Sequence, residues 1–482
     1  MSRLRNWRRK FLTFRELKKR KNLKNEQRLI RYSLTFLIFW FLALFPGRVG
    51  FDTKLAFSLM QSDHGTDWWT GWYWRILQLL TFNGSQIVLF VVIAYSLFWI
   101  ATFQLINSYA SSSVISSRMK LIASMLPIMP VFAMTVQHDV FFCTGILMLI
   151  RHENELQKMN IEKNAYFRAL LFITPLLLTT KQGVILFPLL IFRMLFMMGF
   201  KKTILASSFF SLFFVATPSI GLDHTWSKQS IAIPFIMDIK CAVQHPESKI
   251  SRESMIYLQT LLPYEVWFKP ESCKEIDGNT WNKNINYQNF SFSKTLKVYF
   301  ELLPDHAEIF LMAHIQRSTT VLPPPFFRGP DNQVDLNYAN PIGQGTNLAL
   351  QSAPPLLHPS VDDRSVDLQI KILRPLTYVA QAGIFLVNQA SRYWGWGGLW
   401  FWAIMLHHIY QRREIPSHRF FKTYWYLIFL HFVLFTIGIS ATGRHVMPTI
   451  CVGIITLSRV FLQIWSTEER LERTTYNNSK KE

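Results

Sequence analysis

This chain of 482 residues lacks the sequence motifs by which soluble enzymes bind nucleotides or metals. It contains no GxGxxG after a strand, no GxxxxGK[ST], no HExxH and no GxSxG. Without a phosphate-binding loop, a pump driven by nucleotide hydrolysis is not expected. The chemistry of the chain must then be sought in isolated polar positions.

Charged residues are also scarce. They make up 17% of the chain, whereas hydrophobic residue types make up 50%, and an average soluble domain has about 25% charged residues. The apolar residues fall into long runs, and a helix needs about 20 of them to cross a bilayer. The composition therefore predicts an all-α polytopic membrane protein, a transmembrane helix bundle with an extracytoplasmic region.

The apolar runs predict ten membrane spans. They lie near residues 30–46, 86–106, 119–136, 140–151, 166–180, 184–200, 203–221, 394–410, 423–441 and 448–465. Leu376 to Ala390 is either an interfacial helix or an eleventh crossing.

Basic residues dominate the N-terminal tail. Residues 3–31 hold thirteen Lys or Arg and only two Glu. Such a tail fits the anionic cytoplasmic face of a membrane. Nucleic acid is the alternative partner, but no aromatic-rich soluble domain accompanies the tail, so we expect a membrane lipid and no nucleic acid.

The basic residues also predict the orientation of the bundle. Further Lys and Arg residues cluster in the short segments 118–120, 151–168, 201–202 and 412–422, which alternate with ten spans and so belong on the cytoplasmic side. Both termini then face the cytoplasm. The predicted regions are a basic tail (1–29), an N-terminal transmembrane module (30–221) with its first outer loop at 47–84, an extracytoplasmic region (222–393), C-terminal transmembrane helices (394–465) and a second tail (466–482).

The four cysteines form two groups. Cys143 and Cys451 lie within apolar runs, whereas Cys241 and Cys273 share the long polar segment. If that segment faces an oxidising space, Cys241 and Cys273 fit a disulfide; two unpaired thiols are the alternative. A zinc site would need a tighter cluster of Cys and His residues.

Two carboxylates lie where predicted spans meet the outer face. Asp52 follows Pro46-Gly47 at the end of the first span, and Asp139 follows His138 in a three-residue turn. An ionisable group at this boundary is costly and is a functional candidate. Asp52 also fits the plainer role of a helix N-cap, and a polar turn between two spans needs no function.

Cationic and aromatic residues accompany these carboxylates on the predicted outer face. Arg444 and His445 lie in a short outer turn, against the positive-inside trend. The arginine fork suits a phosphate, whereas Lys181 could equally anchor a span end. Trp68 and Trp72 belong to an aromatic run that fits either an interfacial belt or stacking on a sugar ring.

In these motifs the chain resembles the GT-C superfamily of multi-span glycosyltransferases, in a bacterial form. The resemblance rests on Phe45-Pro46-Gly47 followed by Asp52, on Pro127 and Pro130 before His138-Asp139, on Lys181 with Gly183, and on Arg444-His445 before Pro448. It covers residues 30–221 and 394–465 in order and topology. The single Asp139 departs from the paired acidic motif of the family, and residues 222–393 match none of its sugar-binding domains.

The resemblance implies an enzyme of the bacterial inner membrane that uses a polyprenyl-phosphate sugar and acts on a glycan, lipid or protein acceptor. Asp52 would be the catalytic base and Asp139 would assist it. Arg444, His445, Lys181, His138, Trp68 and Trp72 would bind substrate. The need for a divalent cation such as Mg²⁺ or Mn²⁺ stays open.

Two other functions stay open as well. An O-antigen-type ligase or polymerase would use a long outer loop rich in Arg and His, for which His306, His314 and Arg317 are candidates. A transporter or flippase of lipid-linked glycans would carry charged residues within its spans. Arg193 is the clearest residue of that kind in this sequence.

Overall fold

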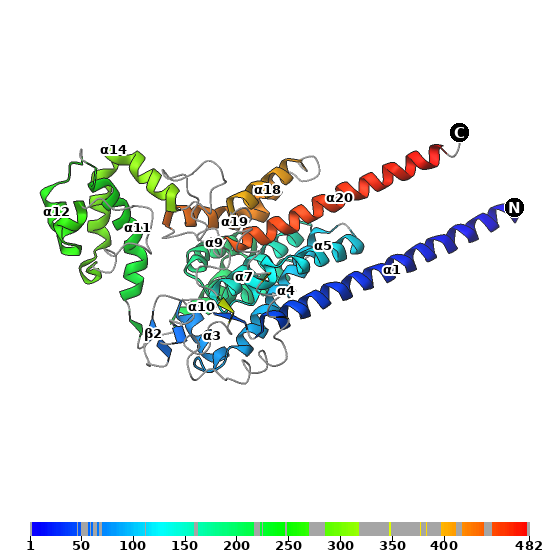
Figure 1. The fold of residues 1–482 in the computed structure, drawn as a ribbon, viewed down its shortest axis with the longest axis horizontal. Coiled ribbons are helices and arrows are strands. Elements are labelled where there is room, and N and C mark those ends of the chain that lie inside the picture. The colour runs from blue at the N-terminus through cyan, green and yellow to red at the C-terminus, as the bar shows by residue number, and fades with distance from the viewer. Residues whose placement is uncertain are drawn as a thin grey trace.

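The structure, a computed structural model of the chain, is predominantly α-helical (Figure 1). It describes residues 2–45, 47–49, 56–57, 59–60, 65–66, 70–110, 112–158, 162–215, 222–223, 225–245, 248–268, 285–317, 347–348, 376, 382, 397–410, 417–437 and 446–479.

The helices in the described residues have the following bounds. They are α1 (Ser2–Leu44), α3 (Gly71–Thr81), α4 (Val88–Tyr109), α5 (Ser113–Met125), α6 (Ile128–Ala133), α7 (His138–Gln157), α8 (Lys163–Leu177), α9 (Lys181–Met198), α10 (Phe200–Val215), α11 (Thr225–Val243), α12 (Arg252–Leu261), α13 (Tyr264–Phe268), α14 (Phe292–Arg317), α18 (Gly397–Tyr410), α19 (Ser417–Ile437) and α20 (Met447–Ser479). A short 3₁₀ helix covers Tyr287–Asn289.

Three helices among the described residues are long and apolar enough to cross a membrane. They are Leu23–Leu44 within α1, Val88–Tyr109, and Met447–Trp465 within α20. The 22 residues of α4 correspond to about 33 Å of helix, close to the thickness of a hydrocarbon core. Shorter apolar helices occupy Leu399–Ile409 and Thr423–Leu434. The helical fold is thus confirmed, and three candidate membrane spans in the described residues suggest a membrane protein, while the number of ten or eleven spans stays a prediction.

The third predicted span, residues 119–136, is broken into two helices. Helix α5 ends at Met125, and α6 begins at Ile128. Leu126 between them is extended, with φ −70° and ψ 116°. Proline disfavours the helical conformation in the residue before it, so Pro127 accounts for the break. The helix over the next predicted span is longer than predicted, because α7 runs on to Gln157 past three charged residues.

The bundle has an aromatic-rich core. Helix α4 packs along α7, α1 along α5, and α18 along α20. Phe98 of α4 and Phe132 of α6 are fully buried, and their ring centroids lie 5.9 Å apart. These contacts bring the N-terminal and C-terminal helices into one core, although about 170 residues separate them in the sequence.

Helices α11 to α14 form a separate module with an apolar core of its own. Trp267 of α13 is fully buried there and donates from Nε1 to the carbonyl of Leu258 at 3.0 Å. Kinked helix α14 packs along α11. The module accounts for most of the described residues in the predicted region 222–393.

Two short strand pairs join the first loop to that region. Strand β1 (Arg48–Val49) pairs antiparallel with β4 (Asn347–Leu348), and β2 (Gly65–Thr66) pairs parallel with β3 (Leu222–Asp223). The all-α prediction omitted these pairs. Since both connect 47–84 with 222–393, the two segments lie at the same end of the bundle, as the predicted topology requires.

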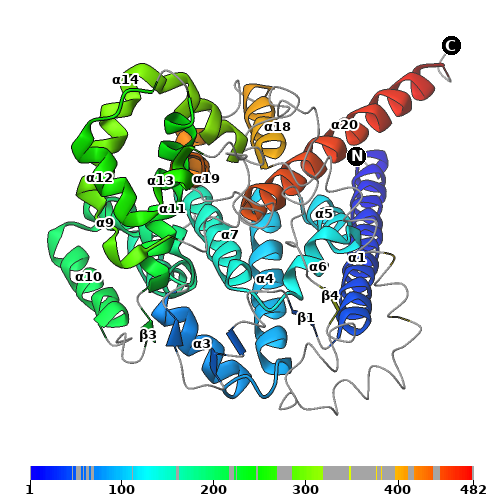
Figure 2. The same cartoon turned by 60° about the vertical axis from the view of Figure 1, so that its left-hand side comes forward.

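The termini lie at the other end. In Figure 1, α1 and α20 project together from one side of the bundle, and the α11–α14 module lies on the opposite side. Figure 2, turned by 60°, shows the helices of the same module grouped together. Tail 1–29 and the first predicted span form one continuous helix, α1, without a break at residue 30.

Candidate functional site

Gly47 fixes the start of the first loop against the bundle. It has φ +121°, and a Cβ there would lie 2.6 Å from Val91 Cγ2 and 3.2 Å from the carbonyl oxygen of Met134. Only glycine fits this close approach without strain. The loop that carries Asp52 therefore starts beside the segment that leads into α7, four residues before His138.

Helix α3 is tied to the end of α8. The hydroxyl of Thr70, the N-cap of α3, accepts from the amide of Tyr73 and donates to the carbonyl of Leu178 at 2.8 Å. Trp72 donates from Nε1 to the carbonyl of Pro175 at 2.9 Å. The last carbonyls of a helix lack partners within it, so these side chains complete the end of α8. Trp72 thus holds this junction in place.

His138 and Asp139 form the first turn of α7. Asp139 is only 2% exposed, and its Oδ1 lies 3.6 Å from Nε2 of His138. The ring of Tyr73 stands edge-on to that of His138, with centroids 5.3 Å apart. The partial positive charge of a helix N-terminus stabilises a carboxylate in this position. The predicted pair therefore lies buried next to the start of α3.

Lys181 is the first residue of α9, directly after the turn that contacts α7. Thr179 of this turn donates to the carbonyl of His138 at 3.3 Å, and the Thr180 hydroxyl caps α9 by accepting from the amide of Gly183 at 3.0 Å. A cation is usually placed at the C-terminal end of a helix. At the N-terminus, Lys181 adds to the positive field of the helix and favours an anion nearby.

The start of α20 packs on the same part of α7. Val446 and Met447 are fully buried, and the thiols of Cys143 and Cys451 contact each other, one helical turn beyond Asp139. Both cysteines are free. Arg444 and His445 directly precede Val446 in the sequence.

The structure thus gathers some of the predicted site residues and leaves others undescribed. His138, Asp139, Trp72 and Lys181 lie on three neighbouring helix starts. Asp52, Trp68, Arg444, His445 and Cys273 lie outside the described residues. Cys241 is buried and disulfide-bonded, and its pairing with Cys273 stays a prediction. Within the described residues, no group of three or more His, Cys, Asp or Glu side chains could hold a metal ion.

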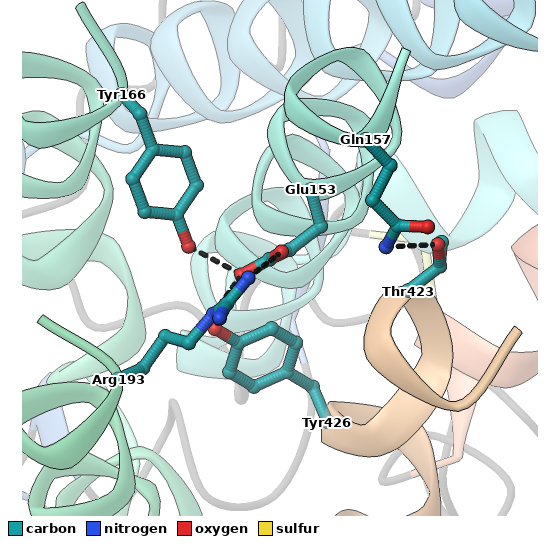
Figure 3. A network of polar contacts seen from close by, with 6 residues as sticks. All are labelled: Glu153, Gln157, Tyr166, Arg193, Thr423 and Tyr426. Atoms are coloured by element: carbon teal, nitrogen blue, oxygen red, sulfur yellow. Dashed lines mark hydrogen bonds and ion pairs between the residues drawn. The ribbon is translucent and has the colours of Figure 1, made fainter. Parts of the chain in front are cut away.

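A buried ion pair, which the sequence did not reveal, lies near the other end of α7 (Figure 3). Glu153 is fully buried and receives two hydrogen bonds from Arg193 of α9, Nε to Oε1 at 3.0 Å and Nη2 to Oε2 at 2.8 Å. Oε1 also accepts from the hydroxyls of Tyr166 in α8 and Tyr426 in α19. Four helices therefore meet on one carboxylate.

Two further side-chain hydrogen bonds attach α19 to the N-terminal helices. Gln157 donates from Nε2 to the hydroxyl of Thr423 at 2.8 Å (Figure 3). The hydroxyls of Tyr109 and Tyr424 also bond to each other. Polar groups inside a membrane bundle are costly unless paired, and here the pairs fix the C-terminal helices on the N-terminal ones.

Arg193 was visible in the sequence as a charge within an apolar run, but Glu153 was not. Forty residues separate the two, so no local spacing connects them. The only available signal was that each is a costly charge inside a predicted membrane module.

Of the three candidate residues for the ligase alternative, only His306 has a side chain within the described residues. His306 of α14 is 5% exposed, and its ring centroid lies 5.6 Å from that of His245 in α11. It faces into the α11–α14 module. The side chains of His314 and Arg317 lie outside the described residues.

Comparison of the chain with protein-family models, with curated proteins and with solved structures found no match.

Proposed function

We propose that the chain is an integral membrane glycosyltransferase of GT-C type. It would move a sugar from a polyprenyl-phosphate donor to an envelope glycan, lipid or protein acceptor on the extracytoplasmic face of a bacterial inner membrane. The observation that carries the proposal is the convergence of the Gly47 turn with the starts of α3, α7 and α9, which together present Trp72, His138, Asp139 and Lys181.

The electrostatics of this end suit a phosphorylated donor. The starts of α7 and α9 lie close together, because Thr179, just before α9, donates to the carbonyl of His138, and Lys181 adds a full positive charge. Helix N-termini bind phosphate groups for this reason. Arg444, just before α20, would supply the bidentate contact to the lipid phosphate.

The proposed reaction needs one base and one leaving group. Asp52 would take the proton from the acceptor hydroxyl, whose oxygen then bonds to the anomeric carbon of the sugar. The bond from that carbon to the phosphate oxygen breaks, and polyprenyl phosphate leaves with the electron pair. Lys181 and Arg444 would stabilise the charge on the departing phosphate, while Asp139 orients His138.

The decisive experiment replaces Asp52. Membranes with the full chain are incubated with polyprenyl phosphate that carries a radiolabelled hexose or pentose, and label is followed from the carrier to the acceptor fraction. Asp52→Asn should abolish transfer at unchanged protein abundance, and Asp63→Asn in the same loop is the matched control. Near-normal transfer by Asp52→Asn overturns the assignment.

The Glu153–Arg193 pair favours a second candidate, a transporter or flippase of lipid-linked glycans. Charged residues inside spans often line the path of a polar substrate or couple its movement to ions. The two candidates differ in covalent outcome. In proteoliposomes with fluorescently labelled polyprenyl-phosphate sugar, a transporter moves the lipid between leaflets unchanged, whereas a transferase releases polyprenyl phosphate.

A further inference from the structure

Arg459 lies in α20 at the end of the bundle opposite Asp139. It is half-buried and follows Met447, the first residue of α20, by twelve positions, which is about 18 Å along the helix. Helix α20 packs on α18, α5, α7 and α4. By the predicted orientation, Arg459 lies in the cytoplasmic half of the predicted span 448–465.

Lys158 and two histidines accompany Arg459. Its guanidinium lies within electrostatic range of Lys158 at the end of α7 and of His407 in α18, and His408 follows His407 in the same helix. Partial burial lowers the pKa of Lys158; the carboxylate of Glu155 opposes this effect, and the positive charge of Arg459 adds a smaller lowering. Two like charges that lie close together indicate a position for an anion.

One carboxylate, Glu155, lies within electrostatic range of Lys158. The salt bridges His138–Asp139, Arg193–Glu153 and Lys297–Glu253 among the described residues do not include Arg459 or Lys158. Lys158 donates to the carbonyl of Ser108 at the end of α4. Its side chain is nonetheless exposed, so an anion can reach this group from outside.

The guanidinium itself has an unused donor. Nε of Arg459 is buried, and no hydrogen-bond partner for it occurs among the described residues. The hydroxyls of Tyr109 and Tyr424 lie within electrostatic range of the same guanidinium but bond to each other. A buried donor left without an acceptor destabilises the folded chain, and a bound oxygen anion would accept a hydrogen bond from it.

We propose that Arg459, with Lys158 and His407 beside it, forms a site for a phosphate group between α4, α7, α18 and α20. Basic pockets between transmembrane helices on the cytoplasmic side bind the head groups of anionic lipids, and a free phosphate offers the same chemistry. The site lies at the far end of α7 from the proposed transfer site and does not depend on it.

The test uses the purified full chain in detergent and its thermal unfolding, followed by tryptophan fluorescence. One arm adds dioleoylphosphatidylglycerol, with monogalactosyldiacylglycerol of the same acyl chains as the phosphate-free control. The other arm adds potassium phosphate against potassium chloride at equal ionic strength. The variants are Arg459→Gln, Arg459→Lys, and Arg168→Gln as a matched control at an exposed arginine of α8.

We expect Arg459→Gln to weaken the apparent affinity for the phosphate ligand about tenfold or more, Arg459→Lys to weaken it less, and Arg168→Gln to leave it unchanged. Protection by phosphatidylglycerol alone identifies a lipid head group, and protection by inorganic phosphate identifies a small anion. The proposal is overturned if Arg459→Gln binds like the wild type, if Arg168→Gln loses as much, or if the galactolipid protects as well as phosphatidylglycerol. Size-exclusion elution checks that each variant is folded.

Discussion

The two ends of α7 each bury a carboxylate, and they do so in different ways. Glu153 lies in a bidentate pair with Arg193 and accepts two further hydrogen bonds from tyrosines. Asp139, fourteen residues earlier, lies at a helix start beside the titratable ring of His138. A carboxylate bonded to four donors on other helices holds the bundle together, whereas one beside an imidazole at a junction of helix ends is suited to chemistry.

The largest effect is expected from Asp139→Asn, measured as sugar transfer. The amide keeps the size of the side chain but removes its charge and its influence on His138. We expect transfer to fall by about 10²-fold or more, the range of a group that assists acid–base catalysis. Thermal stability should change little, since an amide also fits a helix N-terminus. If Asp139→Asn instead lost much stability while the remaining folded protein transferred sugar normally, Asp139 would hold the bundle together rather than take part in chemistry. That result would contradict the comparison of the two ends.

Glu153→Gln should act on stability instead. It leaves the guanidinium of Arg193, only 23% exposed as a side chain, without its counter-charge. Removing one partner of a buried pair costs about 3–5 kcal/mol, and the partial exposure of Arg193 places the expected loss near the lower end. The apparent free energy of unfolding in mixed detergent micelles measures it.

A double variant sharpens this test. Glu153→Leu with Arg193→Met removes both charges and should recover most of the lost stability, because apolar replacements of buried pairs are well tolerated. If the double variant loses lipid-glycan movement while stability returns, the ion pair belongs to a transport path, and the second candidate function gains.

Gly183 and Gly145 both lie against Leu177, at the end of α7 near Asp139. Gly183 meets the backbone of Leu177 and Gly145 meets its side chain, so the two alanine variants compare a backbone constraint with a side-chain constraint. A Cβ on Gly183 would lie 1.7 Å from the carbonyl oxygen of Leu177, whereas one on Gly145 would lie 2.8 Å from Leu177 Cδ2. Gly183→Ala must shift the turn before Lys181, at a cost of about 2–3 kcal/mol. Gly145→Ala also meets Leu177 Cγ at 3.1 Å and Leu176 Cβ at 3.3 Å. These side-chain atoms shift more easily than a backbone carbonyl, so the variant should cost about 1 kcal/mol, the low end of the range for overpacking. Equal thermal shifts of the two variants would contradict this geometry.

The smallest effect concerns a third carboxylate, Glu301, in the α11–α14 module. Its partial burial would raise its pKa, but hydrogen bonds from Ser254 and Ser251 and the charge of Lys297 lower it. A depressed pKa contributes stability that is present above about pH 4.3, the unfolded value, and is lost as pH falls through the folded pKa.

Because Glu301 is largely solvated, we expect a stability difference below about 1 kcal/mol. Glu301→Gln should flatten the fall of the melting temperature between pH 5 and pH 3, in contrast to Glu253→Gln at the exposed Lys297–Glu253 pair. The same slope in wild type and Glu301→Gln would show that other carboxylates control the acid limit.

Much of the helical arrangement was predictable because apolar runs must be buried or face lipid. Segments 86–106 and 448–465 were expected as spans, and helices cover both. The break before Pro127 was not predicted, because a hydropathy average over many residues does not register a single proline that breaks the helix. The α11–α14 module was not predictable either, because its core is assembled from helices in which apolar residues alternate with polar ones and form no long apolar run.

The sequence by itself determined that the chain is helical and has runs that are apolar enough to cross a membrane. It also named the candidate site residues, among them His138, Asp139 and Lys181 in short polar turns between apolar runs and Trp72 in an aromatic run. Only the tertiary structure decided that Glu153 and Arg193 form a pair and that Lys158 lies near Arg459. Such partners come from helices far apart in the chain, and their energies depend on distance and burial, which no local pattern of residues records.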